Sequence, residues 1–214
     1  MTFPSRLVIA SRNPGKIREI ERICADWSLE RLTHEDVDIP EVEEAGSTYL
    51  ENALAKARAV ARATGEPALA DDSGIEVDAL GGAPGPRSAR FGGPDATDDR
   101  NLRALLRAIA GVPRAGRSAR YRAVAVVAWP DGREIWAEGV CEGMLTTAPR
   151  GAGGFGYDPL FEPLGWDRTM AELAPEEKDR ISHRGRALRA LGDLLRRDES
   201  PGEGAGDPRG APKV

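Results

Sequence analysis

Two adjacent carboxylates, Asp71 and Asp72, are the residues of this chain best suited to chemistry. They follow the apolar stretch 68–70 and precede Ser73 and Gly74. The surrounding apolar pattern is typical of a β-strand, which we expect to end or bend at the acids. Because neighbouring residues of a strand point to opposite faces, we expect one carboxylate to face a pocket and the other to be tied into the backbone. A carboxylate there could bind a divalent cation and activate water, although these residues also favour ordinary turns.

A candidate phosphate-binding loop lies near the N-terminus, between a short strand predicted at 7–10 and a helix that carries its apolar face over 17–24. A tight turn into a helix directs backbone N–H groups and the helix dipole at one point, where a phosphate can bind. The spacing is not that of a Walker loop, so an ordinary turn with a solvated lysine is the alternative. The candidate residues are Ser11, Arg12, Asn13, Pro14, Gly15 and Lys16.

A pair of acids, Glu43 and Glu44, precedes a helix that we expect to begin at Thr48. Thr48 and Glu51 have the spacing of a capping box. Acids before a helix commonly serve its dipole, but these two could also bind a metal ion.

A glycine-rich loop over 149–157 contains a candidate nucleobase site. Phe155 could stack on a base, an interaction worth about 1–3 kcal/mol, and Gly156 would let the backbone approach a ligand closely. Tyr157 and Asp158 follow, and the Asp158 carboxylate could accept hydrogen bonds from a base or sugar. Alternatively, this is a surface loop whose aromatic residues fill the core.

The last candidate group is Lys178 with Ser182, His183 and Arg184. Lys178 and Ser182 are one helical turn apart, so these side chains can converge. Arg184 offers a planar fork of donors for phosphate or carbonyl oxygens, whereas His183 could simply cap a helix. Acids for metal and water, cations for phosphate and an aromatic loop for a base suit a nucleotide phosphohydrolase better than an acyl-transfer enzyme.

The composition excludes several other classes. The chain has 214 residues and a formal net charge of −5, so no broad basic surface for a nucleic-acid polymer is implied. The N-terminal apolar run, 7–10, is too short for a signal peptide or a membrane span. The only cysteines, Cys24 and Cys141, form no disulfide framework, which fits a reducing cytoplasm. With two histidines in all, a multi-histidine metal site is excluded.

The pattern of elements that must position these residues predicts an α/β fold with a mixed sheet. Further strands are expected near 37–39, over 121–129 and over 134–145, the last two as a hairpin, and a short strand after Asp158. Helices are expected after Thr97, from Pro175 through Arg180 and over 185–197. We expect one domain over 1–197, followed by a disordered tail over 198–214 that is rich in Gly, Pro and charge.

Taken together, these segments resemble the inosine triphosphate pyrophosphatase family, also called the XTP/dITP diphosphatases. Each motif is weak alone, but their order and spacing over residues 7 to about 196 are specific. The matching stretches are 11–16, Glu43-Glu44, 51–53, 70–74, 81–85, 88–90, 155–159, Glu177-Lys178 and 182–184. In the first motif Arg12 stands where the family often has glycine.

The resemblance implies an elongated, two-lobed fold with a long central mixed sheet and a ligand cleft between the lobes. It also implies a homodimer that uses Mg²⁺ to hydrolyse ITP, dITP and XTP to the nucleoside monophosphate and pyrophosphate. Asp72 would be the proton acceptor and a metal ligand, with Glu43 or Glu44 assisting. The loop 11–16, with Ser73 and Lys178, would bind the triphosphate, and Lys16 and Lys178 would offset charge on the leaving pyrophosphate.

By the same resemblance, residues 155–158 with His183 and Arg184 would line the base pocket. Two alternatives stay open at this point. One is the related septum-formation-inhibitor type of nucleotide pyrophosphatase, which prefers other bases. The other is a nucleotide-binding module without activity.

Overall fold

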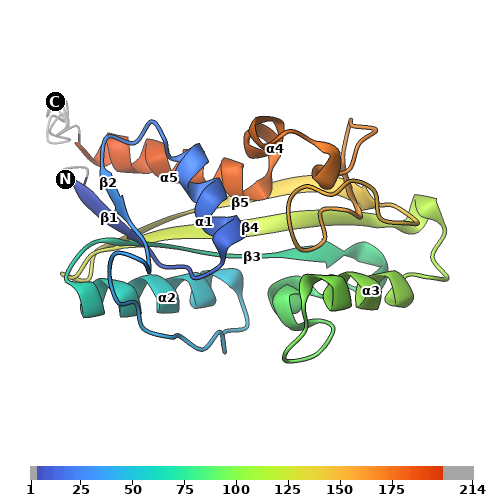
Figure 1. Cartoon of the computed structure of the whole chain (residues 1–214), viewed down its shortest axis with the longest axis horizontal. Coiled ribbons are helices and arrows are strands. Elements are labelled where there is room, and N and C mark those ends of the chain that lie inside the picture. Colours follow the sequence, from blue (N-terminus) through green and yellow to red (C-terminus); the bar gives the residue numbers. More distant parts are fainter. Residues whose placement is uncertain (1–3, 200–214) are drawn as a thin grey trace, which may run out of the picture.

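The computed structural model describes residues 4–199, which form a six-stranded mixed sheet flanked by helices (Figure 1). The strand order is β2-β1-β3-β4-β5-β6. β1 pairs in parallel with β2 and β3, and the remaining pairs are antiparallel. The strands are β1 (Arg6–Ile9), β2 (Glu30–Leu32), β3 (Ala68–Val77), β4 (Ser118–Ala128), β5 (Glu134–Leu145) and β6 (Phe161–Pro163).

Helices cover both faces of the long strands, which gives the molecule an elongated, layered shape (Figure 1). One face carries α1 (Pro14–Ile23), α4 (Pro175–Ile181) and α5 (His183–Glu199). The opposite face carries α2 (Tyr49–Thr64) and α3 (Asp98–Ala108), which lie end to end along the sheet. Short 3₁₀ turns complete the chain: η1 (Asp78–Leu80), η2 (Gly85–Arg90), η3 (Arg114–Gly116) and η4 (Met170–Glu172).

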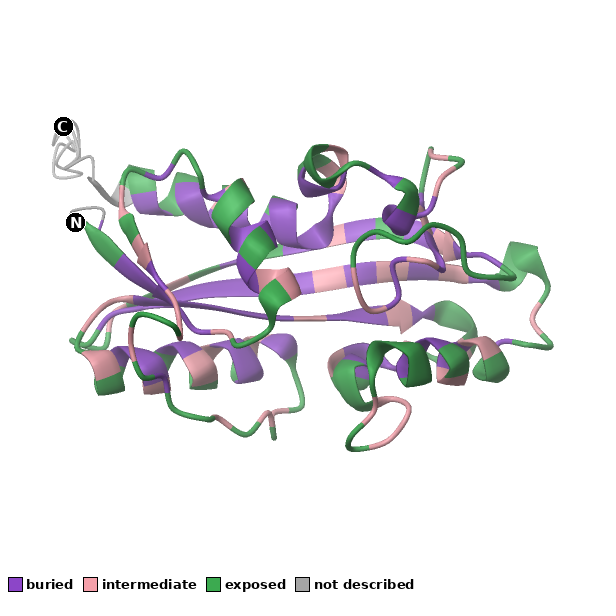
Figure 2. Ribbon diagram, viewed as in Figure 1, coloured by how far each residue is buried: buried purple, intermediate pink, exposed green. Residues whose placement is uncertain are grey.

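Apolar side chains form three core clusters, and Figure 2 shows the burial concentrated along the central strands. Two clusters lie in the lobe that contains β1, one between the sheet and α1 with α5, the other between the sheet and α2. The third fills the lobe that contains α3 and β6. β3, β4 and β5 run through both lobes and join them, so the two lobes share one rigid sheet.

Local sequence signals explain where the helices start and stop. Thr48 and Glu51 form the predicted capping box, and Gly65 ends α2 with a φ of 72°, in the left-handed region that glycine adopts without strain. Pro175 begins α4 as predicted. Tyr121 and Glu134 lie in the expected antiparallel hairpin of β4 and β5.

Several expected boundaries were wrong. β3 neither ends nor bends at the two acids but continues through them to Val77. Residues 37–39 form no strand, and the chain instead enters the sheet earlier, as β2. α5 begins at His183 and extends to Glu199, so it exceeds the helix expected over 185–197 by two residues at each end. The rest of the expected tail, 200–214, lies outside the described residues. No helix within residues 4–199 combines the length and apolar character needed to span a bilayer.

Candidate active site

The site forms where β3 loses its neighbour β1. The two strands pair only through Ala68 and Leu69 of β3, so among the described residues no strand pairs with this edge of β3 from Ala70 up to the isolated bridge between Glu76 and Pro84. Two ammonium groups reach this edge from opposite sides of the sheet. Lys16 Nζ of α1 lies 3.4 Å from the main-chain oxygen of Asp71, and Lys56 Nζ of α2 lies 2.7 Å from the same oxygen. The lysines thus satisfy a carbonyl that a neighbouring strand would otherwise pair.

The free edge also explains how Asp71 and Asp72 share one cleft although they point to opposite faces. Asp71 pairs in register with Ala125 and faces α1 and α5, whereas Asp72 pairs with Val124 and faces α2. Both carboxylates line the same cavity, which wraps around the open edge of β3. The expectation that only one carboxylate faces a pocket and the other is tied into the backbone was wrong, because both line the cavity and Asp71 is held by cationic side chains.

Asp71 is the anchor of a buried ion-pair network. Arg184 donates to Asp71 Oδ2 from Nε at 3.0 Å and from Nη2 at 2.8 Å, and Lys16 Nζ lies 3.2 Å from Oδ1. Burial alone would raise the pKa of Asp71, but Arg184 and Lys16 outweigh it and hold the pKa well below its usual value. Asp71 is therefore held as an anion and is a weaker base than an ordinary aspartate.

Asp72 has a different environment. Asn52 Nδ2 donates to Asp72 Oδ2 at 3.0 Å, and Lys56 Nζ lies 3.4 Å from Oδ1. Burial raises the pKa of Asp72, and the nearby ammonium groups of Lys56 and Lys16 only partly offset this effect. The result is a carboxylate that is more basic than usual and faces a cavity, as a general base requires.

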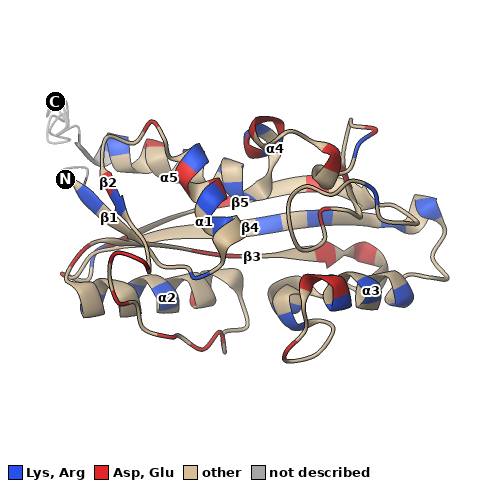
Figure 3. Cartoon of the chain, viewed as in Figure 1, with Lys and Arg blue, Asp and Glu red and all other residues tan. Residues whose placement is uncertain are grey.

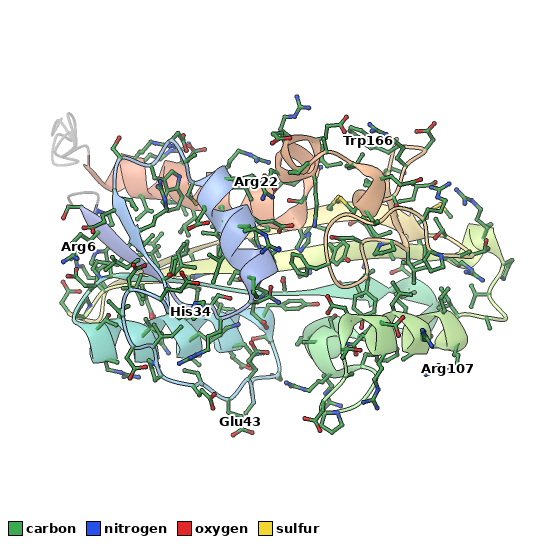
Figure 4. The ribbon with its side chains drawn as sticks, viewed as in Figure 1. Arg6, Arg22, His34, Glu43, Arg107 and Trp166 are labelled. Carbon is green, nitrogen blue, oxygen red and sulfur yellow. The ribbon has the colours of Figure 1, made fainter. Side chains whose placement is uncertain are left out.

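Of the two candidate acids before α2, only Glu44 reaches this centre. Glu44 Oε1 accepts a hydrogen bond from Lys56 Nζ at 2.8 Å, so one ammonium group lies between the Glu44 and Asp72 carboxylates. Glu43 is exposed, and its side chain projects from the lower edge of the molecule (Figure 4). The acids of this loop are visible along the lower edge in Figure 3.

The carboxylate oxygens of Asp72 and Glu44 both lie next to the ammonium group of Lys56, and oxygens of this kind are the ligands that divalent metals such as Mg²⁺ prefer. Within residues 4–199, no three His, Cys, Asp or Glu side chains converge into a ready-made metal site. The pair Asp72 and Glu44 nevertheless matches the way Mg²⁺ is often bound, through one or two carboxylates with substrate phosphates completing the shell.

The predicted phosphate-binding loop leads from β1 into α1. Asn13 is the N-cap of α1, and its Oδ1 accepts hydrogen bonds from the N–H groups of Gly15 at 2.8 Å and Lys16 at 3.1 Å. Asn13 therefore uses two of the N–H groups that the sequence suggested for phosphate. Arg12 is also engaged, because its Nη2 donates to the main-chain oxygen of Ile39 at 2.7 Å. Lys16 is the member of the loop whose charge reaches the centre.

The glycine-rich loop lies against a second buried ion-pair cluster. Lys178 Nζ is 2.5 Å from Asp158 Oδ2 and 2.6 Å from Glu19 Oε1, while the guanidinium of Arg184 lies 2.5 Å from Glu19 Oε2. The ring of Phe155 covers both cations, with its centroid 4.9 Å from Lys178 Nζ and 5.5 Å from Arg184 Cζ. Lys178 thus lies beside the candidate base loop, in contact with Asp158.

Glycine at position 15 leaves room for the ring of Phe155 to lie over Lys178 and Arg184. A Cβ at Gly15 would lie 2.7 Å from Phe155 Cδ1, well inside normal contact. Pro14 and Gly15 do not line the cavity themselves; they start α1 and admit the ring.

Two further aromatic contacts shape the floor of the base region. The imidazole of His183 stacks on Tyr121 with ring centroids 4.5 Å apart, and the hydroxyl of Tyr121 donates to Asp158 Oδ1 at 3.3 Å. Burial, followed by the charges of Arg184 and Lys178, lowers the pKa of His183 well below its usual value. His183 is therefore neutral. The hydroxyl of Tyr157 donates to the main-chain oxygen of Ser88 at 2.7 Å, which joins this loop to η2.

Position 74 leaves no room for a side chain, because η2 packs directly against β3 there. A Cβ at Gly74 would lie 2.3 Å from the main-chain oxygen of Gly85 and 2.5 Å from Ser88 Oγ. Ser88 Oγ accepts a hydrogen bond from the N–H of Ile75 at 2.9 Å. Ser73, one residue earlier, accepts a hydrogen bond from Arg184 Nη2 at 2.9 Å, so it lies within the Asp71 network.

One cavity of about 730 Å³ brings the predicted residues together. Of the residues singled out from sequence, its lining includes Ser11, Arg12, Asn13, Lys16, Glu43, Glu44, Asp71, Asp72, Ser73, Phe155, Gly156, Tyr157, Asp158, Lys178, His183 and Arg184.

Sequence reasoning missed four residues of this site: Lys56, Asn52, Glu19 and Tyr121. Lys56 had a signal that could have revealed it, because it lies between Ala53 and Ala57 on the buried stripe of α2. A lysine in such a stripe needs a buried partner. Glu19, buried between Ile17 and Ile20 of α1, carries the same signal. Tyr121 had no such signal, since a tyrosine in a strand of apolar and polar residues does not differ from its neighbours in the way a buried charged residue does.

Comparisons with known proteins identify the family of this chain. The family model described as "Ham1 family" matches residues 7–194. A protein of Symbiobacterium thermophilum named dITP/XTP pyrophosphatase is 54% identical over 183 residues, covering 86% of this chain and 91% of the relative. A protein of the same name from Streptomyces coelicolor is 51% identical over 195 residues, covering 90% of this chain and 98% of that protein.

A solved structure of a HAM1 protein from Coxiella burnetii superposes with a TM-score of 0.81 at 40% identity, covering 92% of this chain and all of the other. Matches of this length and identity leave no room for a chance likeness of isolated motifs. With its long mixed sheet and the cleft at the free edge of β3, this chain belongs to the Ham1 family.

Proposed function

We propose that this chain hydrolyses non-standard purine nucleoside triphosphates to the nucleoside monophosphate and pyrophosphate. The observation that carries the proposal is the shared cavity. Asp72, whose pKa is raised, lies there with Lys16 and Lys56, and the same cavity is lined by Phe155, whose ring contacts the Lys178 ammonium group. The names of the relatives support it, and they place the chain in the class of nucleoside triphosphate diphosphatases.

Asp72 acts as the proton acceptor for the attacking water. Its raised pKa makes it a better base than an exposed aspartate, and Asn52 fixes its orientation through the 3.0 Å hydrogen bond to Oδ2. Lys16 and Lys56 offer positive charge on the two sides of the β3 edge, where the polyphosphate binds. Charge that develops on the leaving pyrophosphate is stabilised by these fixed ammonium groups.

Asp72 and Glu44 would hold Mg²⁺, which would supply positive charge to the phosphates and make a bound water more acidic. The role proposed for Lys56 is an addition to the sequence-based expectation, which gave the phosphate role to Lys16 and Lys178. The position of Lys178, in contact with Asp158 and under the Phe155 ring, supports a role at the base.

The base is recognised beside Phe155. The ring presents a face for stacking, and the buried cations Lys178 and Arg184 lie behind it. A 6-oxo purine such as hypoxanthine or xanthine offers an acceptor to this positive region. Adenine has an amino group at that position and would offer no acceptor to the N–H groups of Lys178 and Arg184. Binding of adenine nucleotides would therefore be disfavoured. ITP, dITP and XTP are accordingly the proposed substrates.

We further propose that the protein is a homodimer located in the cytoplasm. Resemblance to the pyrophosphatase family supports the dimer, and two buried thiols, Cys24 and Cys141, suit a reducing compartment. Light scattering coupled to size-exclusion chromatography would measure the mass in solution, and a monomer would contradict the first part.

A pyrophosphate-release assay over a nucleotide panel tests the function. ITP, dITP and XTP should be cleaved far faster than ATP, dTTP or UTP, and EDTA should abolish the reaction. Preference for dTTP or UTP would favour the septum-formation-inhibitor type instead. Nucleotide binding without pyrophosphate release, with or without added Mg²⁺, would indicate a module without activity.

A further inference from the structure

The acidic segment from Ile39 to Glu44 lies along the rim of the cavity and has no regular secondary structure. In the part of the chain that the structure describes, no hydrogen bond joins the backbone of residues 39–45 to another backbone N–H or carbonyl group. Its position therefore depends on contacts with side chains. Ile39 is buried in the α2 core cluster, while the residues after it are half-buried or exposed.

Two arginines from separate elements hold the two ends of this segment through its main chain. Arg12, just before α1, donates from Nη2 to the main-chain oxygen of Ile39 at 2.7 Å. Arg90, the last residue of η2, donates from Nη2 to the main-chain oxygen of Glu44 at 2.9 Å. The two contacts join the segment to the first strand–helix turn at one end and to the turn after β3 at the other.

Arg90 binds the main chain of Glu44, the residue whose carboxylate lies near Asp72. The main-chain oxygen of Glu44 is bound by Arg90, and its side chain is bound by Lys56, which also contacts Asp72. Fixing the backbone of Glu44 limits where its carboxylate can go. Without that contact, the segment would have to be ordered from the Ile39 end and from the Gly46 N–H, which donates to Asn52 Oδ1 at 2.8 Å.

We propose that Arg12 and Arg90 are positioning residues that clamp the acidic segment, so that Glu44 stays beside Asp72. The inference rests on the proposed function for the role of Glu44 as a metal ligand. It departs from the sequence-based expectation for Arg12, because the guanidinium holds the rim of the site and is not reserved for phosphate. A clamp of this kind pre-organises a ligand that is carried on an irregular segment.

The test uses Arg90→Met and Arg12→Met, which keep the length of the side chain but remove its donors. Arg87→Met is the matched control, since Arg87 lies in the same turn, is exposed and is outside the cavity lining. The first readout is cleavage of the metal-free, nucleotide-free protein by glutamyl endopeptidase, with the sites after Glu41, Glu43 and Glu44 identified by mass. Cleavage should be about fivefold faster or more in the two clamp variants and unchanged in Arg87→Met, because proteolysis follows local opening.

The second readout is Mn²⁺ binding without nucleotide, followed by electron paramagnetic resonance. Affinity should fall by about tenfold in Arg90→Met, and Arg90→Lys should recover part of it. Unchanged cleavage in both clamp variants would overturn the clamp. Faster cleavage with unchanged Mn²⁺ affinity would overturn the link to Glu44. Neither readout requires turnover, so a protein that proved to have no pyrophosphatase activity would refute the proposed function and leave the clamp to be judged by cleavage alone.

Discussion

Lys16 and Lys56 approach one main-chain oxygen, that of Asp71, from opposite faces of the sheet, at 3.4 Å and 2.7 Å. The two lysines lie on helices that pack on different sides of β3, and they meet because β1 stops short of this point. A strand edge without a neighbour has thereby become a positively charged rim. Neighbouring carboxylates that point to opposite faces can then serve one ligand.

The two aspartates are expected to respond differently to the loss of charge. Asp72→Asn should lower kcat by about 10²–10⁴-fold with little change in nucleotide affinity, because it removes the proton acceptor and leaves the lysines in place. Steady-state kinetics with ITP, together with nucleotide binding by calorimetry, would measure both quantities. Near-normal turnover would contradict the role given to Asp72.

Asp71→Asn should act on stability. Within residues 4–199 it removes one of the two carboxylate partners of Arg184, a residue of which 1% is exposed, and leaves only Glu19 as the other. Breaking a buried ion pair in this way costs about 3–5 kcal/mol, which denaturant unfolding would show as a lower midpoint. Equal stability of the Asp71 and Asp72 variants would mean that the structural anchor has been assigned to the wrong residue.

Lys56→Met should lower kcat/KM by about 10²-fold, because it removes a fixed cation from the polyphosphate site. Arg103→Met is a suitable control, since Arg103 is exposed on α3 and pairs only with Asp99 of the same helix in the described residues. Activity that survives Lys56→Met but is lost in Lys178→Met would restore the phosphate role to Lys178, as the sequence alone suggested.

The pKa of His183 predicts how stability changes with pH. The native pKa lies well below the usual histidine value of about 6.5, so in acid the unfolded chain binds a proton that the folded chain does not. The free energy of unfolding should therefore fall as pH drops below about 6.5, with a slope from this group approaching about 1.4 kcal/mol per pH unit. His183→Phe keeps a ring for the Tyr121 stack and should remove that component. Parallel stability curves for the two proteins between pH 7 and 5 would contradict the assignment.

Gly74→Ala should destabilise the fold by about 1–3 kcal/mol, because the new Cβ would lie 2.3 Å from the main-chain oxygen of Gly85. Gly111→Ala is the control, as a Cβ there meets no heavy atom within 4 Å. Thermal unfolding of both variants would measure the difference. A Gly74 variant as stable as the Gly111 variant would show that η2 can move away from β3 at no cost.

The sequence by itself determined the α/β class, most of the helices and strands, and many of the residues that gather at the cleft. These rest on local causes: the capping box of Thr48, glycine at the end of α2, apolar periodicity, and a set of short motifs in a specific order. It also predicted correctly that Asp71 and Asp72 point to opposite faces of the sheet, since alternation along a strand is a local property.

Only the tertiary structure decided what each charged residue contacts. Arg184 pairs with Asp71 across 113 positions of sequence, and Lys56 reaches β3 because α2 packs beneath it. The early end of β1, which opens the cleft, and the placement of Lys178 behind Phe155 were likewise not readable from local patterns. The physical reason is that burial and ion pairing arise between segments distant in sequence, and local propensity carries no information on which distant charges will meet.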